Sequence, residues 1–310
     1  MADTKAVIQS LRDAIHIGLV GQDSLVDGLL RALLSNGHVL IEGVPGLAKT
    51  RAVKLLSAAC SGDFARVQFT PDLLPSDIIG TRIYDRNTGE FQTKQGPVFT
   101  NFLLADEINR AAPKVQSALL EAMQERQVTI GGETRELPRP FLVFATQNPV
   151  EQQGTYPLPE AQVDRFLCKL VVDYPTEAEE SEIVKMVMNE TRMPAVSPVL
   201  DLDGLLELQE YVRKVFVDDK IVEYATQIVR ATRDLAGLDL GASPRASISL
   251  IQLARADAVL SGDRHVEPEH IKAVAPDVLR HRLLLNYQSE AEGATAEQFI
   301  STILSKLKVP

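Results

Sequence analysis

The sequence contains no tryptophan, only two cysteines and five histidines, and its aromatic content is 5%. Cys60 and Cys168 lie in apolar stretches, so we interpret them as small buried hydrophobic residues rather than as a disulfide or a metal-binding pair. His265 and His270 are separated by about 140° around a helix, which is poor spacing for shared metal ligation. The sequence therefore gives no indication of a zinc or redox site.

Long apolar runs and an excess of positive charge are also missing. No run approaches the roughly 18 apolar residues that a membrane-spanning helix needs, and the N-terminus leads into an amphipathic segment rather than an apolar signal core. We therefore expect a cytoplasmic protein with no membrane insertion. The formal net charge is −10, which disfavours a broad nucleic-acid surface because such surfaces need clustered Lys and Arg. A local basic groove stays open.

Apolar runs and helical patterns alternate through the first half of the chain. We predict strands at residues 38–42, 66–69, 101–106, 141–147 and 166–172, and helices at residues 5–18, 22–36 and 49–60. The strand-like runs are nearly continuous in apolar residues, which is typical of strands covered on both faces. The sequence therefore predicts an α/β fold around a mostly parallel sheet.

Two segments interrupt this alternation. Residues 70–97 are rich in Pro, Gly and Asp and contain a turn signal at Arg86-Asn87-Thr88-Gly89. Gly131-Gly132 is a hairpin signal within residues 127–137. We predict two exposed inserts, which serve either as surface decoration or as contacts for a partner.

The second half of the chain changes character after Tyr174-Pro175. Helical periodicity dominates from Val199 onward, at residues 202–214, 219–235, 244–261, 268–280 and 296–306. Ser243-Pro244 supplies an N-cap followed by proline at the first helical position. We predict an α/β core at residues 1–174, which carries both inserts, and a helical domain at residues 175–310.

The segment between the first predicted strand and the next helix has the composition of a phosphate-binding loop. It consists of Gly43, Val44, Pro45, Gly46, Leu47, Ala48, Lys49 and Thr50. Glycines let the backbone approach an anion, and successive N–H groups at a helix start then point at phosphates. Lys49 would neutralise the β and γ phosphates, and the Thr50 hydroxyl can ligate Mg²⁺. The strict pattern has Gly in place of Ala48, and a methyl group is tolerable there if that residue has helical dihedrals.

Two carboxylates follow the strand predicted at residues 101–106. An acid at the C-terminal end of such a strand lies at the edge of an open sheet, where ligands bind. Asp106 can hold the metal ion, directly or through water. Glu107 can orient or deprotonate the attacking water. With the phosphate loop upstream, the pair predicts nucleotide hydrolysis rather than an acidic turn.

Three further polar residues are candidates for contact with the γ-phosphate. Asn148 ends another strand and could position water there, although an Asn before a Pro is also an ordinary turn. Arg165 precedes the fifth strand and is a candidate arginine finger, since a permanently charged planar guanidinium suits developing phosphoryl charge. Arg245 opens a helix of the second half and could report the nucleotide state to the lid. The alternatives are a salt-bridge partner for Arg165 and a simple surface cation for Arg245.

Together these motifs resemble those of an AAA+ ATPase, and specifically of the MoxR family. The resemblance rests on residues 43–50, 105–110, 145–149, 164–166 and 241–246, in the expected order over roughly residues 20–285. The family carries Ala at the position of Ala48. Membership would imply a five-stranded αβα sandwich with a lid, in which the first insert is a β-hairpin within the second helix and the second is a hairpin before the sensor strand.

The resemblance also implies roles for individual residues. Asn148 would be sensor 1 and Arg245 sensor 2, while Arg165 would act on the nucleotide of a neighbouring subunit. The adenine pocket would be lined by Val20, Gly21 and Gln22, and we include Arg51, after the phosphate loop, among the candidate nucleotide-binding residues. The subunits would form a ring, usually hexameric, that binds ATP or ADP with Mg²⁺. It would act as a chaperone-like machine that remodels or assembles client proteins or inserts their metal cofactors, often with a separate von Willebrand factor A domain protein.

Other interpretations stay open. Related hairpins contact DNA in some AAA+ branches, so a nucleic-acid motor is one alternative, against which the acidic charge weighs. A magnesium-chelatase-like subunit is a second, and a nucleotide-gated scaffold with negligible turnover is a third, which an intact Glu107 disfavours. The sequence does not identify the client, the ring size, the need for ATP in assembly, the direction of coupling or the role of Arg110.

Overall fold

The core of the molecule is a five-stranded sheet. The structure is a computed structural model that describes residues 2–149, 154–189 and 194–310. The strands are β1 (Val39–Glu42), β2 (Phe64–Gln68), β5 (Phe102–Asp106), β8 (Leu142–Gln147) and β9 (Cys168–Val171). Their order is β2-β5-β8-β1-β9, and every pairing is parallel. The five predicted strands and the mostly parallel sheet are confirmed.

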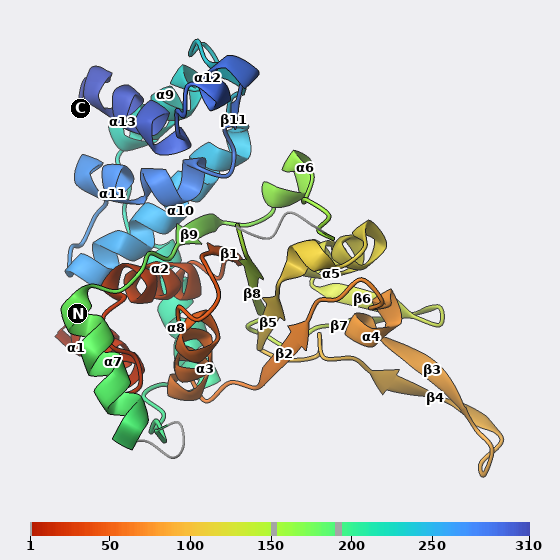
Figure 1. The fold of residues 1–310 in the computed structure, drawn as a ribbon. Coiled ribbons are helices and arrows are strands. Elements are labelled where there is room, and N and C mark those ends of the chain that lie inside the picture. The colour runs from red at the N-terminus through yellow and green to blue at the C-terminus, as the bar shows by residue number, and fades with distance from the viewer. Residues whose placement is uncertain (1, 150–153, 190–193) are drawn as a thin grey trace.

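Helices cover both faces of this sheet, which makes it an αβα sandwich (Figure 1). Helices α1 (Ala2–His16), α2 (Asp23–Leu34) and α3 (Lys49–Ala59) lie on one face, and α5 (Pro113–Glu125) lies on the other. Successive strand residues point to opposite faces: Leu104 belongs to the cluster under α1–α3, whereas Leu103 and Ala105 belong to the cluster under α5. Helix α5 falls in a segment for which the sequence pattern made no prediction.

Parallel strands bring their C-terminal ends to one edge, and the register fixes which residues meet there. Glu42 of β1 pairs with Gln147 of β8, and Gln68 of β2 pairs with Asp106 of β5. The phosphate loop follows β1 at the same edge. The motifs that are far apart in the sequence therefore converge at the carboxyl edge of the sheet.

Both predicted inserts contain antiparallel hairpins. The first holds a short helix α4 (Pro75–Ile79) and the strands β3 (Gly80–Asp85) and β4 (Glu90–Gln95), which project from the body of the molecule (Figure 1). The second comprises β6 (Gln127–Ile130) and β7 (Glu133–Glu136). The hairpins touch, since Arg135 Nη2 donates to Thr93 Oγ1 at 3.4 Å.

The described part of the second half is mostly helical and contains one small sheet. Its helices are α7 (Glu177–Asn189), α8 (Leu202–Arg213), α9 (Asp219–Ala231), α10 (Pro244–Ser261), α11 (Pro268–Leu279), α12 (Tyr287–Ala291) and α13 (Ala296–Lys306). Two short strands, β10 (Leu238–Leu240) and β11 (Leu284–Leu285), pair in antiparallel fashion in this half of the chain. The expectation of an almost wholly helical second half is confirmed. The small sheet was not predicted, because strands of two or three residues carry no period. Within the described ranges, no helix has the length and apolarity needed to cross a bilayer.

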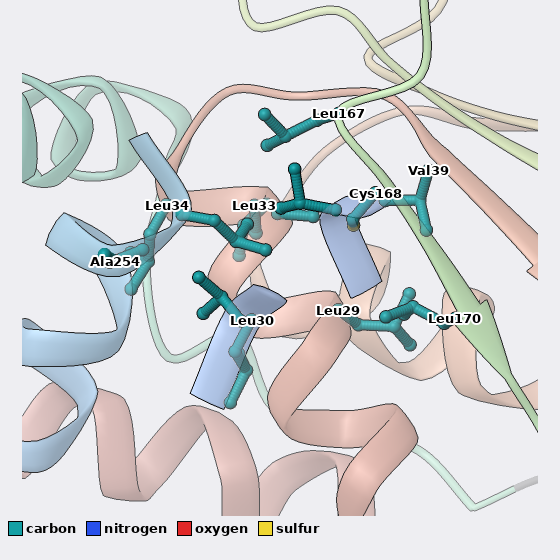
Figure 2. Close-up of a cluster of buried hydrophobic side chains, with 14 of the residues drawn as sticks. Leu29, Leu30, Leu33, Leu34, Val39, Leu167, Cys168, Leu170 and Ala254 are labelled. Atoms are coloured by element: carbon teal, nitrogen blue, oxygen red, sulfur yellow. The ribbon is translucent and has the colours of Figure 1, made fainter. Parts of the chain in front are cut away.

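The two halves share one hydrophobic core. Figure 2 shows where α2, β9 and α10 meet, with a cluster that includes Leu30 and Leu33 of α2, Leu170 of β9 and Ala254 of α10. Helix α8 also packs on α2, and Gln209 Nε2 donates to Leu33 O at 2.7 Å. A boundary at residues 174 and 175 stays a prediction, since this core crosses it. Cys60 and Cys168 are buried and free, as expected.

Candidate nucleotide-binding site

The phosphate loop joins β1 to α3 at the carboxyl edge of the sheet. Gly46 has φ of 90°, a conformation that favours glycine. Ala48 at the N-cap of α3 has φ 56° and ψ 16°, which is left-handed. The condition stated for a tolerated methyl group, right-handed helical dihedrals, is therefore not met: the residue lies in the left-handed region, which costs an L-residue about 1–2 kcal/mol.

A cavity of about 450 Å³ opens in front of this loop. The residues that line it come from the loop and α3, from the end of β5 and from the end of β8: Pro45, Gly46, Leu47, Ala48, Lys49, Thr50, Arg51, Lys54, Asp106, Glu107, Thr146, Gln147 and Asn148. The structure thus brings most of the predicted phosphate-binding residues, both predicted carboxylates and Asn148 to one cavity. Gly43 and Val44 form the start of the loop without lining the cavity.

Lys49 is the cation at the centre of the loop. Its Nζ donates to the carbonyl oxygens of Gly43 and Val44, the latter at 3.4 Å. Burial lowers the pKa of Lys49, and the nearby charges of Asp106, Glu107 and Glu42 oppose that shift. A half-buried ammonium beside an open cavity suits an anion that brings additional negative charge.

Asp106 and Glu107 are fixed by a residue that the sequence interpretation did not assign. Thr146 on β8 is 1% exposed. Its Oγ1 donates to Asp106 Oδ1 at 2.6 Å and accepts from the backbone N–H of Glu107 at 2.9 Å. Glu107 has φ 57°, so this bond holds it in a left-handed conformation. The available signal was its position at the end of a strand, one residue before Gln147-Asn148, which by itself is weak.

The Glu107 carboxylate has two further partners. Gln68 Nε2 donates to Glu107 Oε2 at 2.6 Å, and Arg110 Nη1 donates to the same oxygen at 2.9 Å. The role of Arg110 was left open by the sequence, and the structure pairs it with Glu107. Both partners fix the direction in which the candidate base points.

The donor set beside Lys49 fits a magnesium ion. Mg²⁺ prefers oxygen ligands and is usually bound by one or two carboxylates together with substrate phosphates and waters. Thr50 and Asp106 line the same cavity and supply a hydroxyl and a carboxylate. Asp106 Oδ2 accepts from Arg66 Nη2 at 2.7 Å, so Arg66 already places a positive charge at this carboxylate.

A second cavity of about 270 Å³ adjoins the first and shares Gly46, Leu47, Ala48 and Arg51 with it. The rest of its lining is largely apolar and comes from the N-terminal segment and from α7: Gly18, Leu19, Val20, Gln22, Pro175, Ile183, Met186 and Val187. Val20 and Gln22 were expected at an adenine pocket. The contribution of α7 was not, because nothing in its pattern distinguishes these apolar residues from core residues.

Gly21 lies between Val20 and Gln22 and packs against α7. Its φ is 61°, and a Cβ there would lie 2.1 Å from Glu179 Oε1. Glu179 in turn accepts from the Thr176 backbone N–H at 2.7 Å at the start of α7. Glycine at this position allows α7 to close the side of the apolar cavity.

The two candidate arginines lie elsewhere. Arg165 follows the short helix α6 (Glu160–Val163), and its Nη1 donates to Leu120 O at 3.0 Å. Arg245, on the first turn of α10, lies 3.5 Å from Asp164 Oδ2. Neither arginine lines the phosphate cavity of its own chain. The role of Arg245 as sensor 2 stays a prediction, and in this arrangement its guanidinium lies beside Asp164.

Comparison with known proteins agrees with this geometry. Residues 38–168 match the model of the ATPase family associated with various cellular activities (AAA), and residues 230–303 match the AAA lid domain. The chain is 51% identical over 301 residues to Chaperone MoxR1 of Mycobacterium tuberculosis, and this match covers 94% of this chain and 79% of MoxR1. It is 47% identical over 292 residues to the uncharacterized protein YeaC of Bacillus subtilis, covering 94% of this chain and 91% of YeaC.

A solved structure agrees as well. The crystal structure of a candidate ATPase from Cytophaga hutchinsonii superimposes with a TM-score of 0.93 at 46% sequence identity, over 100% of this chain and 96% of that one. The αβα core and the helical lid are therefore those of AAA proteins, and the chain binds nucleotide and has the ATPase activity of that family. The chain belongs to the MoxR family of AAA ATPases.

Proposed function

We propose that this ATPase binds Mg·ATP in the two adjoining cavities and uses its hydrolysis for chaperone-like remodelling of client proteins. The observation that carries the proposal is the convergence of Lys49, Thr50, Asp106, Glu107 and Asn148 on one cavity. The apolar cavity under α7 accepts the adenine, and the loop with the first turn of α3 accepts the triphosphate.

Each residue of the phosphate cavity has a stated task in this proposal. Lys49 would neutralise the β and γ phosphates. Thr50 and Asp106 would hold a magnesium ion, which would offset the negative charge of the phosphates. Glu107 accepts a proton from the attacking water, held in direction by Gln68 and Arg110. Asn148, buried at the end of β8, orients that water near the γ-phosphate.

The positions of Arg165 and Arg245 support a ring. Both lie outside the phosphate cavity of their own chain. Arg165 directly follows Asp164 in the chain, and Arg245 contacts the Asp164 carboxylate. Placed at a subunit boundary, they would serve a neighbour's γ-phosphate, so that hydrolysis depends on assembly. We propose a ring, most simply a hexamer, in which loss of the γ-phosphate drives rigid-body motion that the two hairpins carry to a client.

The ATPase test compares Glu107→Gln and Arg165→Ala with the wild type. Glu107→Gln should bind ATP with wild-type affinity and turn over at least about 10²-fold more slowly. Arg165→Ala should do the same while still forming rings. Equal turnover in the wild type and Glu107→Gln would instead indicate a nucleotide-gated scaffold, and full turnover in Arg165→Ala rings would refute the assignment of that arginine.

The client test uses the Glu107→Gln protein as a trap. Loaded with ATP, it should retain clients that the wild type releases, and recovery of a separate von Willebrand factor A domain protein would support the partner that the family resemblance implies. Salt-dependent DNA binding with DNA-stimulated hydrolysis would favour a nucleic-acid motor. Stimulation by a chelatase partner would favour a magnesium-chelatase-like subunit.

A further inference from the structure

Asp164 connects the lid to the segment that carries Arg165. It follows α6 directly and precedes Arg165 in the chain. Its carboxylate accepts three hydrogen bonds from lid side chains: Arg282 Nε at 2.7 Å to Oδ1, and Ser243 Oγ at 3.0 Å and Arg245 Nη1 at 3.5 Å to Oδ2. One carboxylate of the core thus joins two separate parts of the lid, the start of α10 and the turn after α11.

Arg282 extends this connection to the main chain on both sides of Arg165. Its side chain is 1% exposed. Besides the Asp164 carboxylate, it donates from Nη2 to Phe166 O at 2.7 Å and to Asp164 O at 3.4 Å, and from Nη1 to Leu167 O at 3.3 Å. Residues 164–167 are therefore folded around one buried guanidinium of the lid. A buried guanidinium depends on its carboxylate partner, because an uncompensated charge in the interior is strongly unfavourable.

Ser243 connects the same carboxylate to the helix that bears Arg245. It is the N-cap of α10, and its Oγ accepts from the backbone N–H of Arg245 at 3.2 Å while donating to Asp164. The carboxylate also lies at the positive end of an 18-residue helix. Any rotation of α10 against the core must therefore move Asp164 or break its bonds.

The bonds from Arg282 reach the backbone around Arg165, whereas the Arg165 side chain bonds to α5. It is half-buried, and its Nη1 reaches the Leu120 carbonyl of α5. The direction in which Arg165 leaves the surface is consequently set by the backbone at residues 164–167, which the lid holds.

We infer that Asp164 is a positioning residue, which together with Arg282 makes the orientation of Arg165 depend on the position of the lid. The inference rests on the proposed role of Arg165 at a neighbouring subunit's nucleotide. Through this latch, defined by Asp164, Arg282 and Ser243, a movement of the lid in one subunit alters hydrolysis in the next. The ATP site of the subunit that carries Asp164 is not part of the latch.

Mixed rings test the inference, because they separate the effect of a subunit's Arg165 on its neighbour from the activity of that subunit's own ATP site. Wild-type subunits are combined with an excess of Lys49→Ala subunits, which cannot hydrolyse ATP but offer an intact Arg165. In parallel mixtures the excess subunits also carry Asp164→Asn, or Arg165→Ala as the reference for a lost finger. Asp263→Asn, at a lid carboxylate bonded to His270 instead, is the matched control.

The expected result is a turnover per wild-type subunit at least about tenfold lower with the Asp164→Asn partners than with Lys49→Ala alone, approaching the Arg165→Ala mixture. The Asp263→Asn partners should have no effect. Asp164→Asn alone should keep its affinity for fluorescent ADP within about twofold, so the change lies in kcat rather than in KM. Ser243→Ala removes one bond of the latch and should give a smaller loss in the same direction, even if Asp164→Asn folds poorly.

Amide hydrogen exchange gives a readout that needs no ATP. In rings without nucleotide, Asp164→Asn should increase exchange at residues 163–168 and at the first turn of α10 by about tenfold. Two results together would overturn the latch: unchanged exchange at these residues, and wild-type subunits that are as active beside Asp164→Asn partners as in the Lys49→Ala mixture. The proposed ATPase function would still stand, because it depends on the turnover of the wild-type protein. If Arg165→Ala partners also leave wild-type neighbours fully active, the action of Arg165 on a neighbour fails, and the latch fails with it.

Discussion

Replacement of Thr146 by Val tests how the two acidic residues of the phosphate cavity are held. Valine keeps the shape and the strand preference of threonine but removes the hydroxyl. Thr146 is 1% exposed, so its two bonds are largely shielded from solvent. The bond to Asp106 Oδ1 at 2.6 Å has a charged acceptor, and bonds of this kind contribute about 1.5–3 kcal/mol. The bond from the Glu107 N–H at 2.9 Å adds about 0.5–1.5 kcal/mol.

The free energy of unfolding should therefore fall by about 2–4.5 kcal/mol in Thr146→Val. Urea unfolding measures it, as a lower midpoint at an unchanged m-value. Turnover should fall at least about tenfold, because Glu107 loses the bond that keeps it in its left-handed conformation. Thr146→Ser keeps both bonds and is the control. A Thr146→Val protein with wild-type stability and turnover would refute this explanation of how the carboxylates are positioned.

Three further predictions concern the loop, the core and the apolar cavity. Ala48→Val should weaken nucleotide binding and stability, because a β-branched residue strongly disfavours the left-handed region, whereas Ala48→Gly should retain binding; equal affinities by calorimetry in both variants would contradict the observed dihedrals. Burial lowers the pKa of His38 from 6.5 to about 3, so the unfolded chain binds an extra proton between these values and stability falls as the pH drops below 6.5, by up to about 1.4 kcal/mol per pH unit. His38→Gln should reduce that slope in urea unfolding at pH 4–7, and an unchanged slope would show that His38 is not the group. Met186→Ala should reduce the affinity for ADP about tenfold, measured by titration with fluorescent ADP, while an equal affinity would exclude α7 from the adenine pocket.

The sheet and the phosphate loop could be predicted because their signals are local. Continuous apolar runs indicate strands covered on both faces, and a glycine-rich turn followed by Lys49-Thr50 has a meaning wherever a strand precedes it. Asp106 and Glu107 were predicted for the same reason, since they end a strand. Parallel pairing then brings these ends together without any further information.

The residues that fix those groups could not be predicted, because their roles depend on contacts between distant segments. Thr146 reaches Asp106 only through the pairing of β8 with β5, and Gln68 reaches Glu107 from β2. Met186 and Ile183 look like core residues until α7 is placed beside the phosphate loop. The left-handed conformation of Ala48 was missed since the residue type favours a helix, and the tertiary structure overrides this preference.

The placement of Arg245 was missed for a related reason. A Ser-Pro-Arg helix start indicates where a helix begins but not which surface it faces. Only the packing of α10 against α2 and the bond from Ser243 to Asp164 place this arginine beside the Arg165 segment. The family resemblance supplied a role for Arg245, which stays a prediction, and the structure adds its contact with Asp164.

The central claim is tested most directly by calorimetric titration of Mg·ATP into the Glu107→Gln protein. The double variant Glu107→Gln/Lys49→Ala is titrated for comparison. Binding should be seen at one site per chain in the first protein, should weaken when magnesium is removed, and should be lost in the second. Absence of heat from Mg·ATP and Mg·ADP, or equal binding in both proteins, would contradict the assignment of the cavity at Lys49, Asp106 and Glu107 as the ATP site.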